Sequence, residues 1–314
     1  MITELGSGYF LSKRIESPGH FSFEPFFFLN PQFLSLSSAS SIQHHYWLED
    51  NRKICQGHFA IQQNAGDSMF RGISTPFSGF QFAPGVQTEI REKMLQAILS
   101  DLGKNAEIEI RLAPNCYYNS DAMFIDLLTD FKFKQTIIDF NHHLKVGHRP
   151  FRDGVDQANK NKLNKAQKDG ISFSFHDATH LEAAYQLIKK NRQAKGYPLS
   201  MTFDQLSQAF SAFSNKYYLS IGQFGESLAS VIISIRVTSR ILYNFYMADN
   251  YDYRSYSPLV AHNDFIYSWA QKQGYELIDL GTSSENGIRN EGLSDFKKHL
   301  GGIETNKIQI LRRP

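Results

Sequence analysis

The sequence has few cysteines, no long apolar run and almost no net charge. Its two cysteines, Cys55 and Cys116, lie far apart and form no CxxC pair. They indicate neither a disulfide framework nor a cysteine-based zinc site, and we expect both to be reduced. Nowhere do 18 apolar residues follow one another, and the first residues lack the pattern of a secretory signal. We therefore expect a cytoplasmic protein without a membrane span.

The charge balance excludes a general attraction to nucleic acid or to acidic membranes. The chain has 33 Lys and Arg residues against 31 Asp and Glu residues, a net charge of +2. An anionic partner must therefore be bound by a local cluster of basic residues. At 314 residues, of which 41% are hydrophobic, the chain is long enough for two domains, each with its own core.

Several common catalytic motifs are also missing. The sequence contains no Walker A motif, no GxSxG, no HExxH and no GxGxxG. It therefore lacks the motifs typical of P-loop NTPases, α/β-hydrolases, zincin proteases and dinucleotide-binding enzymes. The histidine pairs 44–45 and 142–143 lie in expected strands, where adjacent side chains point to opposite faces. That is poor geometry for a metal ligand set, and we predict no metal site.

What the sequence does contain is one order of elements that occurs twice. In each half, three strands separated by short polar turns are followed by a loop, an amphipathic helix and another strand. Gly103 and Gly274 end the two helices, and Ser257 and Pro258 begin the second one. The expected ranges are 43–49, 53–62, 68–74, 86–103 and 106–113 in the first half, and 216–223, 227–237, 241–249, 257–273 and 275–281 in the second.

Each half then adds a short helix and a last strand. These are expected at 120–131 and 133–146, and again at 292–300 and 307–313. The fold class is therefore α+β, with two copies of one unit and a mostly antiparallel sheet in each. We place the domains at 1–150 and 151–314, because a polar, Lys-rich and Asn-rich segment begins near residue 150.

A basic helix is expected just after this boundary. It contains Lys160, Lys162, Lys165 and Lys168. Such a run is either the solvated face of the helix or a basic wall that faces a binding site.

Five segments of the second half resemble the Fem peptidyltransferases and their relatives, which are built from two GNAT (acyl-CoA N-acyltransferase) units. In chain order they read NKLNKAQKDGI, LIKKNRQAKGYP, YNFYMADNYDYRSYSP, WAQKQGYELIDLGTSS and GLSDFKKHLGG. In the first half, STPFSGF at 74–80 resembles a Pro-Phe-Gly-Gly type loop of the same proteins. The resemblance implies two tandem GNAT-like units, each a mixed sheet flanked by helices, with the active cleft in the second unit.

The same resemblance implies an N-acyltransferase that moves an acyl group from acyl-CoA to an amine. A GNAT unit binds the pyrophosphate of its donor with backbone N–H groups at a helix start, which here implies Arg254, Ser257, Leu259 and Val260. Ser257 and Pro258 stand where glycines are usual, and Pro258 removes one N–H donor. Two alternatives therefore stay open: a Fem-like transferase that takes aminoacyl-tRNA and modifies a cell-wall precursor, and a non-catalytic binding or scaffold protein. The acceptor is a small-molecule or peptidyl amine.

Acyl transfer to an amine needs groups that move protons and groups that hold developing charge. For catalysis we select Lys297, Tyr246 and Asp279, and for substrate binding Lys195, Ser283 and Arg289. Tyrosines in strands usually pack in the core, and Asp279 could simply begin a turn. Strand alternation predicts that Asn244 and Tyr246 share one face while Tyr243 and Phe245 share the other.

Lys297 and Lys298 lie side by side in the segment SDFKKHLGG. On one interpretation both favour the negative end of a short helix, which Gly301 ends. The resemblance instead assigns Lys297 to the substrate and Lys298 to the solvated side. Adjacent helical residues point about 100° apart, so both cannot reach one cleft.

Overall fold

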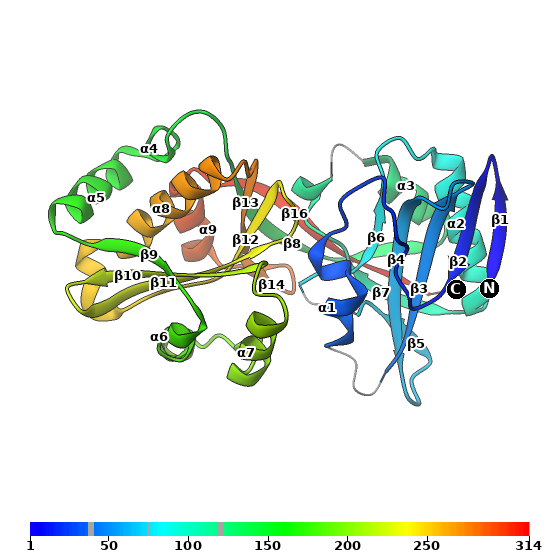
Figure 1. Ribbon diagram of the computed structural model, residues 1–314, viewed down its shortest axis with the longest axis horizontal. Coiled ribbons are helices and arrows are strands. Elements are labelled where there is room, and N and C mark those ends of the chain that lie inside the picture. The colour runs from blue at the N-terminus through cyan, green and yellow to red at the C-terminus, as the bar shows by residue number, and fades with distance from the viewer. Residues whose placement is uncertain (37–40, 74–75, 119–121, 314) are drawn as a thin grey trace. The chain divides into compact units, whose positions relative to one another are not determined.

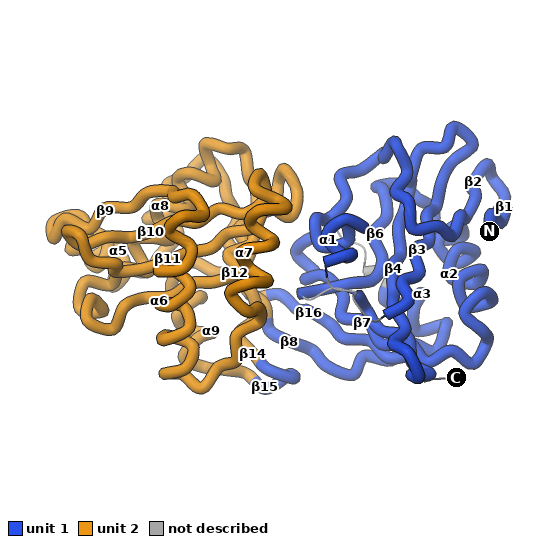
Figure 2. The backbone as a smooth tube through the Cα atoms, turned by 60° about the horizontal axis from the view of Figure 1, so that its bottom comes forward, with its two compact units in different colours: residues 1–140, 285–288, 305–314 blue, residues 141–284, 289–304 orange. Residues whose placement is uncertain are grey.

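A computed structural model describes residues 1–36, 41–73, 76–118 and 122–313, without the side chains of 122–124 (Figure 1). The first two residues of the 74–80 loop therefore lie outside the described residues. The chain forms two compact units (Figure 2). Unit 1 comprises Met1–Phe140, Glu285–Ile288 and Thr305–Pro314, and unit 2 comprises Asn141–Ser284 and Arg289–Glu304.

Unit 1 contains the first copy of the predicted element order. Strands β3 (Ser41–Asp50), β4 (Cys55–Asn64) and β5 (Met69–Arg71) form an antiparallel meander. Helix α2 (Thr88–Leu102) follows, and β7 (Glu107–Arg111) then pairs parallel to β5. The remaining elements of this part are β1 (Ile2–Gly6), β2 (Tyr9–Lys13), η1 (Phe27–Leu29), α1 (Pro31–Ser35), β6 (Gly79–Phe82), η2 (Asn115–Tyr117) and α3 (Ala122–Asp130).

The α2 helix forms for the reason its sequence suggests. Ile90, Met94 and Ile98 recur at helical spacing and are almost completely buried against the sheet. The helix ends at Gly103, whose φ of 98° is a conformation that other residues rarely adopt.

Unit 2 contains the second copy. Strands β10 (Tyr217–Phe224), β11 (Ser227–Arg236) and β12 (Ile241–Asp249) form the meander, and α8 (Pro258–Lys272) leads to β13 (Leu277–Thr282), which pairs parallel to β12. The repeated order predicted from the sequence is therefore confirmed. The other elements are α4 (Phe151–Gly154), α5 (Gln157–Lys168), β9 (Ser172–His176), η3 (Ala178–His180), α6 (Leu181–Ala194), α7 (Phe203–Ala212), η4 (Tyr251–Tyr256), β14 (Ser284–Glu285), β15 (Ile288–Arg289) and α9 (Glu291–His299).

Helices cover both faces of the unit 2 sheet. In Figure 1, α5 and α8 lie on one face, and α6 and α7 lie on the other. The α5–α8 side packs Leu163, Val260 and Ile266 into one core with Ile232 and Ile278 of the sheet. Burial of these apolar side chains from both sides holds the central strands in place.

The last strands of the two halves are exchanged between the units. Strand β8 (Phe133–Lys145) ends the first half, yet its residues 141–145 pair antiparallel with β13 in unit 2. Strand β16 (Ile303–Arg312) ends the second half, yet its residues 309–312 pair antiparallel with β7 in unit 1. The division of the chain therefore differs from the expected 1–150 and 151–314: the main boundary is at 140/141, and two later segments belong to unit 1.

Among the described residues, no helix has both the length and the apolar character needed to cross a membrane.

Candidate active site

Two β-bulges lie where the pairing of β12 with β13 ends. Within the described chain, the two strands pair only over 241–243 and 277–279. The next residues carry the bulges: the register of β12 against β11 shifts at Phe245, and that of β13 against β8 shifts at Leu280. A bulge bends its strand and redirects the side chains that follow. The predicted catalytic residues lie at and around these two bulges.

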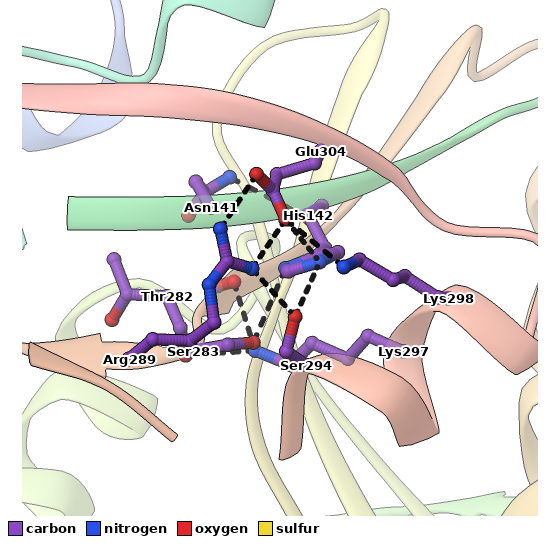
Figure 3. A network of polar contacts seen from close by, with 10 residues as sticks. Asn141, His142, Thr282, Ser283, Arg289, Ser294, Lys297, Lys298 and Glu304 are labelled. Carbon is purple, nitrogen blue, oxygen red and sulfur yellow. Dashed lines mark hydrogen bonds and ion pairs between the residues drawn. The ribbon is translucent and has the colours of Figure 1, made fainter. Parts of the chain in front are cut away.

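Lys297 is buried and donates hydrogen bonds to the end of β13. Only 2% of its surface is exposed. Its Nζ donates to the carbonyl oxygens of Gly281 and Thr282, both at 2.8 Å (Figure 3). Burial lowers the pKa of Lys297 to about 7, an effect that Asp279 opposes and Arg192 reinforces. The amine can therefore exchange a proton near neutral pH.

Lys298 has a different environment. Its side chain is 46% exposed, and its Nζ lies 3.5 Å from Oε2 of Glu304. The structure thus gives the two adjacent lysines separate surroundings, one among backbone carbonyls and one at the surface.

The paired glycines after α9 allow close backbone packing. A Cβ atom on Gly302 would lie 2.5 Å from the carbonyl oxygen of Lys297. The backbone N–H of Gly302 donates a hydrogen bond to the same oxygen at 2.9 Å. Gly301 has a φ of 82°, and a Cβ there would lie 2.6 Å from the carbonyl oxygen of Gly154. Both glycines are therefore required by contacts that hold Lys297 and the end of its helix.

Asp279 stabilises the bulge in β13. It is 3% exposed, and its Oδ1 accepts hydrogen bonds from the Gly281 N–H at 2.7 Å and from Nδ2 of Asn141 at 2.8 Å. The ring of Tyr243 lies against Gly281, 3.4 Å from the position of a Cβ atom there. Burial raises the pKa of Tyr243, and the charge of Asp279 adds to this. Tyr243, Asp279 and Lys297 thus meet around Gly281.

A buried histidine that the sequence did not single out joins this group. His142 is completely buried, and its Nδ1 lies 3.2 Å from Oγ of Ser283, while its Nε2 lies 3.4 Å from Oγ of Ser294 (Figure 3). Burial, reinforced by Lys297, lowers the pKa of His142 to about 4. The signal for His142 in the sequence is the adjacent histidine pair of the expected strand 133–146, which bears on metal binding only through the opposite directions of its side chains.

Arg289 and Glu304 complete the network around His142. The guanidinium of Arg289 donates to both carboxylate oxygens of Glu304, at 2.6 and 2.9 Å, and to Oγ of Ser294 at 2.9 Å. Its hydrogen bonds hold the pKa of Glu304 at about 2. Of the predicted substrate-binding residues, Ser283 and Arg289 therefore lie in this network beside Lys297.

Tyr246 points to the other face of the sheet. Its hydroxyl oxygen accepts the N–H groups of Ser200 at 3.0 Å and Met201 at 3.2 Å, and Arg192 of α6 lies over its ring. Asn244 instead contacts Asn263 of α8. The predicted alternation, which put Asn244 and Tyr246 on one face, is wrong because the bulge at Phe245 adds a residue between them.

The predicted donor-binding residues lie at the start of α8. Arg254 binds the carboxylate of Asp249 through Nε at 2.9 Å and Nη2 at 3.2 Å, and it stacks on Tyr251. Ser257 is in the left-handed conformation, with φ of 52°, and makes no side-chain cap. Its carbonyl accepts the N–H of Val260 at 3.1 Å. Val260 packs its side chain in the core, so its backbone is the part that can meet a ligand, whereas Leu259 is only partly buried against that core.

Two further predicted groups lie near this helix start. Lys195 is exposed at the end of α6, where Asp249 and Arg254 act on its charge. Of the basic helix, Lys165 donates to the Ser255 carbonyl at 2.9 Å and lies over the ring of Tyr256. Among the described residues, His, Cys, Asp and Glu side chains form no group of three that could hold a metal ion.

Comparison with known proteins identifies the fold. No protein-family model matches the sequence, and neither does any curated sequence. Among solved structures, FemX is similar over 93% of this chain and 94% of its own, with 12% identity and a TM-score of 0.72. The C-terminal domain of a putative lysylphosphatidylglycerol synthetase from Agrobacterium fabrum is similar over 88% and 84%, with 9% identity and a TM-score of 0.57.

A tandem GNAT protein from the clavulanic acid biosynthesis pathway is also similar, over 88% of this chain and 84% of its own, with 10% identity and a TM-score of 0.50. The chain has the Fem-related double-GNAT fold. The predicted fold class is confirmed, and at these identities the likeness concerns the fold alone.

Proposed function

We propose that the protein is a transferase that moves an acyl group onto an amine. The observation that supports this most directly is the environment of Lys297: a buried amine with a pKa of about 7, next to the bulges of β12 and β13, in a double-GNAT fold. A general acid or base is most effective when its pKa lies near the working pH.

Lys297 has the bonding pattern that proton transfer requires. A neutral amine has two N–H groups and one lone pair, and the two carbonyls accept two N–H groups. The fourth position around Nζ is then a lone pair in the neutral form and a third N–H in the charged form. We propose that the acceptor attacks as a neutral amine and that the lone pair of Lys297 takes the proton that its nitrogen loses as the new C–N bond forms. The resulting Lys297 ammonium then gives this proton to the leaving thiolate or alkoxide as the C–S or C–O bond breaks.

The first candidate donor is acyl-CoA. Its pyrophosphate would meet the start of α8, where Arg254, Ser257 and the backbone of Leu259 and Val260 lie. The positive end of the helix dipole favours an anion there. Lys195, exposed near Arg254, would add to the positive charge.

The second candidate donor is aminoacyl-tRNA, and the geometry of the same helix start favours it. Pro258 has no N–H, the N–H of Val260 is bonded to Ser257, and Arg254 is paired with Asp249. Few donors are thus free for a pyrophosphate. An aminoacyl ester needs no such site, and the chain is more similar to FemX than to the tandem GNAT protein. The acceptor would then be a peptidyl amine of a cell-wall precursor, and the reaction would take place in the cytoplasm.

Binding and transfer measurements separate these candidates. Acetyl-CoA or a longer acyl-CoA at about 100 times its dissociation constant should stabilise the fold by about 2.7 kcal/mol, which a thermal-shift assay detects. Absence of stabilisation by every acyl-CoA and by free coenzyme A would reject the acyl-CoA donor. Transfer from charged tRNA to an amine-bearing peptide, followed by mass spectrometry, then tests the second candidate. If neither donor supports transfer, the protein is a non-catalytic member of the fold.

Lys297→Met and Lys298→Met form the matched pair for the catalytic step. Lys297→Met should lower the rate of transfer about 100-fold or more, because general acid–base catalysis contributes about 10²–10⁴. Lys298→Met should change it less than twofold. Equal effects of the two substitutions would contradict the proposed role of Lys297.

A further inference from the structure

His142 connects the two elements that surround Lys297. Ser283 follows directly after Thr282, the last residue of β13, whose carbonyl accepts a hydrogen bond from Lys297. Ser294 precedes Lys297 by one helical turn on α9, so the two side chains lie on the same face of that helix. His142 lies between Ser283 and Ser294, with all three residues inaccessible to solvent.

The partners of His142 include a group next to a guanidinium and a carboxylate. A guanidinium can only donate, so Oγ of Ser294 accepts from Arg289. Nε2 of His142 lies 3.4 Å from that oxygen and 3.6 Å from Oε2 of Glu304, while Nδ1 lies 3.2 Å from Oγ of Ser283. A neutral imidazole has one donor and one acceptor, so one ring nitrogen donates and the other accepts. The chain of bonds runs from Arg289 through Ser294 and His142 to Ser283, and Glu304 anchors Arg289 at its start.

We propose that His142 is a positioning residue for the transfer reaction: bonded to Ser283 and Ser294, it fixes α9 against the end of β13 and so holds Nζ of Lys297 on the two carbonyls. This inference rests on the proposed function of Lys297. It also gives Ser283 and Arg289 a part in that arrangement, because they terminate the chain of bonds at its two ends.

Close packing around His142 supports a positional role. Cβ of His142 lies 3.6 Å from the position of a Cβ on Gly302, the residue whose N–H binds the carbonyl of Lys297. The charged groups that act on Lys297 come from other elements, Asp279 on β13 and Arg192 on α6. Loss of His142 would therefore alter the burial of Lys297 without removing either of these charges.

The test compares two similar histidines of unit 2. His262 is also completely buried between two serines, with Ser230 at 2.8 Å and Ser220 at 2.9 Å, but it lies on α8. Ser294→Ala and Ser220→Ala each remove one buried hydroxyl from such a histidine. The first breaks the proposed network, whereas the second is the matched control.

The measurement is the titration of Lys297 by NMR of protein labelled in the lysine side chains, which needs no substrate. In Ser294→Ala and in His142→Gln, looser packing should admit water and raise the pKa of Lys297 by about one unit or more. In Ser220→Ala it should stay at the wild-type value. Where wild-type transfer is measurable, Ser294→Ala should lower its rate about tenfold and move the pH profile in the same direction.

Two results would overturn the inference. One is an unchanged pKa of Lys297 in folded Ser294→Ala protein. This variant tests the inference even if His142→Gln does not fold, because it removes only one hydroxyl group. The other is an equal rise in Ser220→Ala, which would indicate general loosening. If the wild-type protein transfers no acyl group, the proposed function fails, while the NMR titration still tests the link between His142 and Lys297.

Discussion

Lys297 is bound by backbone carbonyls rather than by a carboxylate. A buried lysine normally keeps its charge through an acidic partner, but the atoms that Nζ contacts belong to Gly281 and Thr282. Carbonyl dipoles compensate a charge less fully than a carboxylate does, so desolvation dominates and the pKa falls. The same contacts make the residue part of the fold, and its removal leaves two buried carbonyls without their donor. We therefore expect Lys297→Ala to reduce both transfer and stability.

The lowered pKa predicts how stability depends on pH. Lys297 has a pKa of about 7 in the folded protein and an ordinary value of 10.5 in the unfolded chain. Between these values the unfolded chain binds more protons, so this residue makes the fold more stable as pH rises from 7 to 10.5. The slope is at most about 1.4 kcal/mol per pH unit. Urea unfolding of wild type and Lys297→Met at pH 7.5 and 9 should show the smaller rise in the variant.

Lys298→Met is the control for this measurement, because the Lys298 side chain is 46% exposed. It should keep the wild-type slope. If Lys297→Met gained as much stability with pH as the wild type, the pH dependence would not arise from the lowered pKa of Lys297.

Adding one methyl group at Gly302 should lower the stability of the protein strongly. A Cβ there would lie 2.5 Å from the Lys297 carbonyl, a backbone atom that cannot rotate away. Gly302→Ala should therefore cost about 1–3 kcal/mol of unfolding free energy, as overpacking typically does. Gly292→Ala, in the first turn of α9 and with only Oδ1 of Asn290 at van der Waals distance, 3.9 Å from the Cβ position, should be neutral or slightly stabilising. Chemical denaturation of both variants measures the difference, and similar losses would show that the contact is unimportant.

At the scale of elements, sequence periodicity was enough to find the helices and strands of the repeated order, but neither their bulges nor elements outside the repeat such as α6 and α7. The segments 217–224, 227–236 and 241–249 were predicted to within a residue or two. The extra residues at Phe245 and Leu280 do not interrupt the apolar and polar pattern, because a bulge adds a residue of ordinary type. That is why Tyr246 was expected on the same face of the sheet as Asn244.

His142 could not be inferred from local sequence for a related reason. Its partners Ser283 and Ser294 are 141 and 152 residues away. Lys297, by contrast, could be selected from the sequence, because the resemblance to a family indicated its position in the chain. Tertiary hydrogen bonds of this kind depend on strand pairing, which a single sequence does not specify.

The start of α8 stores conformational strain at Ser257. Its φ of 52° is left-handed, a region that a glycine occupies without steric cost. Ser257→Gly should therefore stabilise the protein by about 0.5–1 kcal/mol, since its side chain makes no capping bond that would be lost. The midpoint of urea unfolding reports this change. A destabilised Ser257→Gly variant would show instead that the hydroxyl has an interaction of its own.

At the scale of the whole molecule, the two halves of the sequence are not self-contained. The repeated element order suggested one domain per half, but β8 and β16 each pair in the unit formed by the other half. Which strand pairs with which depends on contacts between segments far apart in the chain, and the pattern within one half does not specify them. The α+β fold was therefore predictable from the sequence, whereas the compact units of the structure divide at 140/141 and include two later segments.

The exchange predicts that the halves fold poorly when separated. A 1–150 fragment keeps β5 but lacks β16, the antiparallel partner of β7. A 151–314 fragment keeps β12 but lacks Asn141, His142 and the rest of β8, the antiparallel partner of β13. Each should show no cooperative thermal transition by circular dichroism. Coexpression should restore a folded complex, because the missing strands are then supplied in trans. A 151–314 fragment that melts cooperatively near the wild-type temperature would disprove the dependence.

The exchange also has a consequence for the order in which the protein can form during synthesis. Arg111 of β7 and its partner Gln309 of β16 are separated by 198 residues. At about 5–20 residues per second, a ribosome needs roughly 10–40 s to make that interval. During this time the hydrogen-bonding edge of β7 has no neighbour on that side. The first unit to be synthesised is therefore among the last structures to be completed, and the nascent chain is most exposed to aggregation while the second unit is being made.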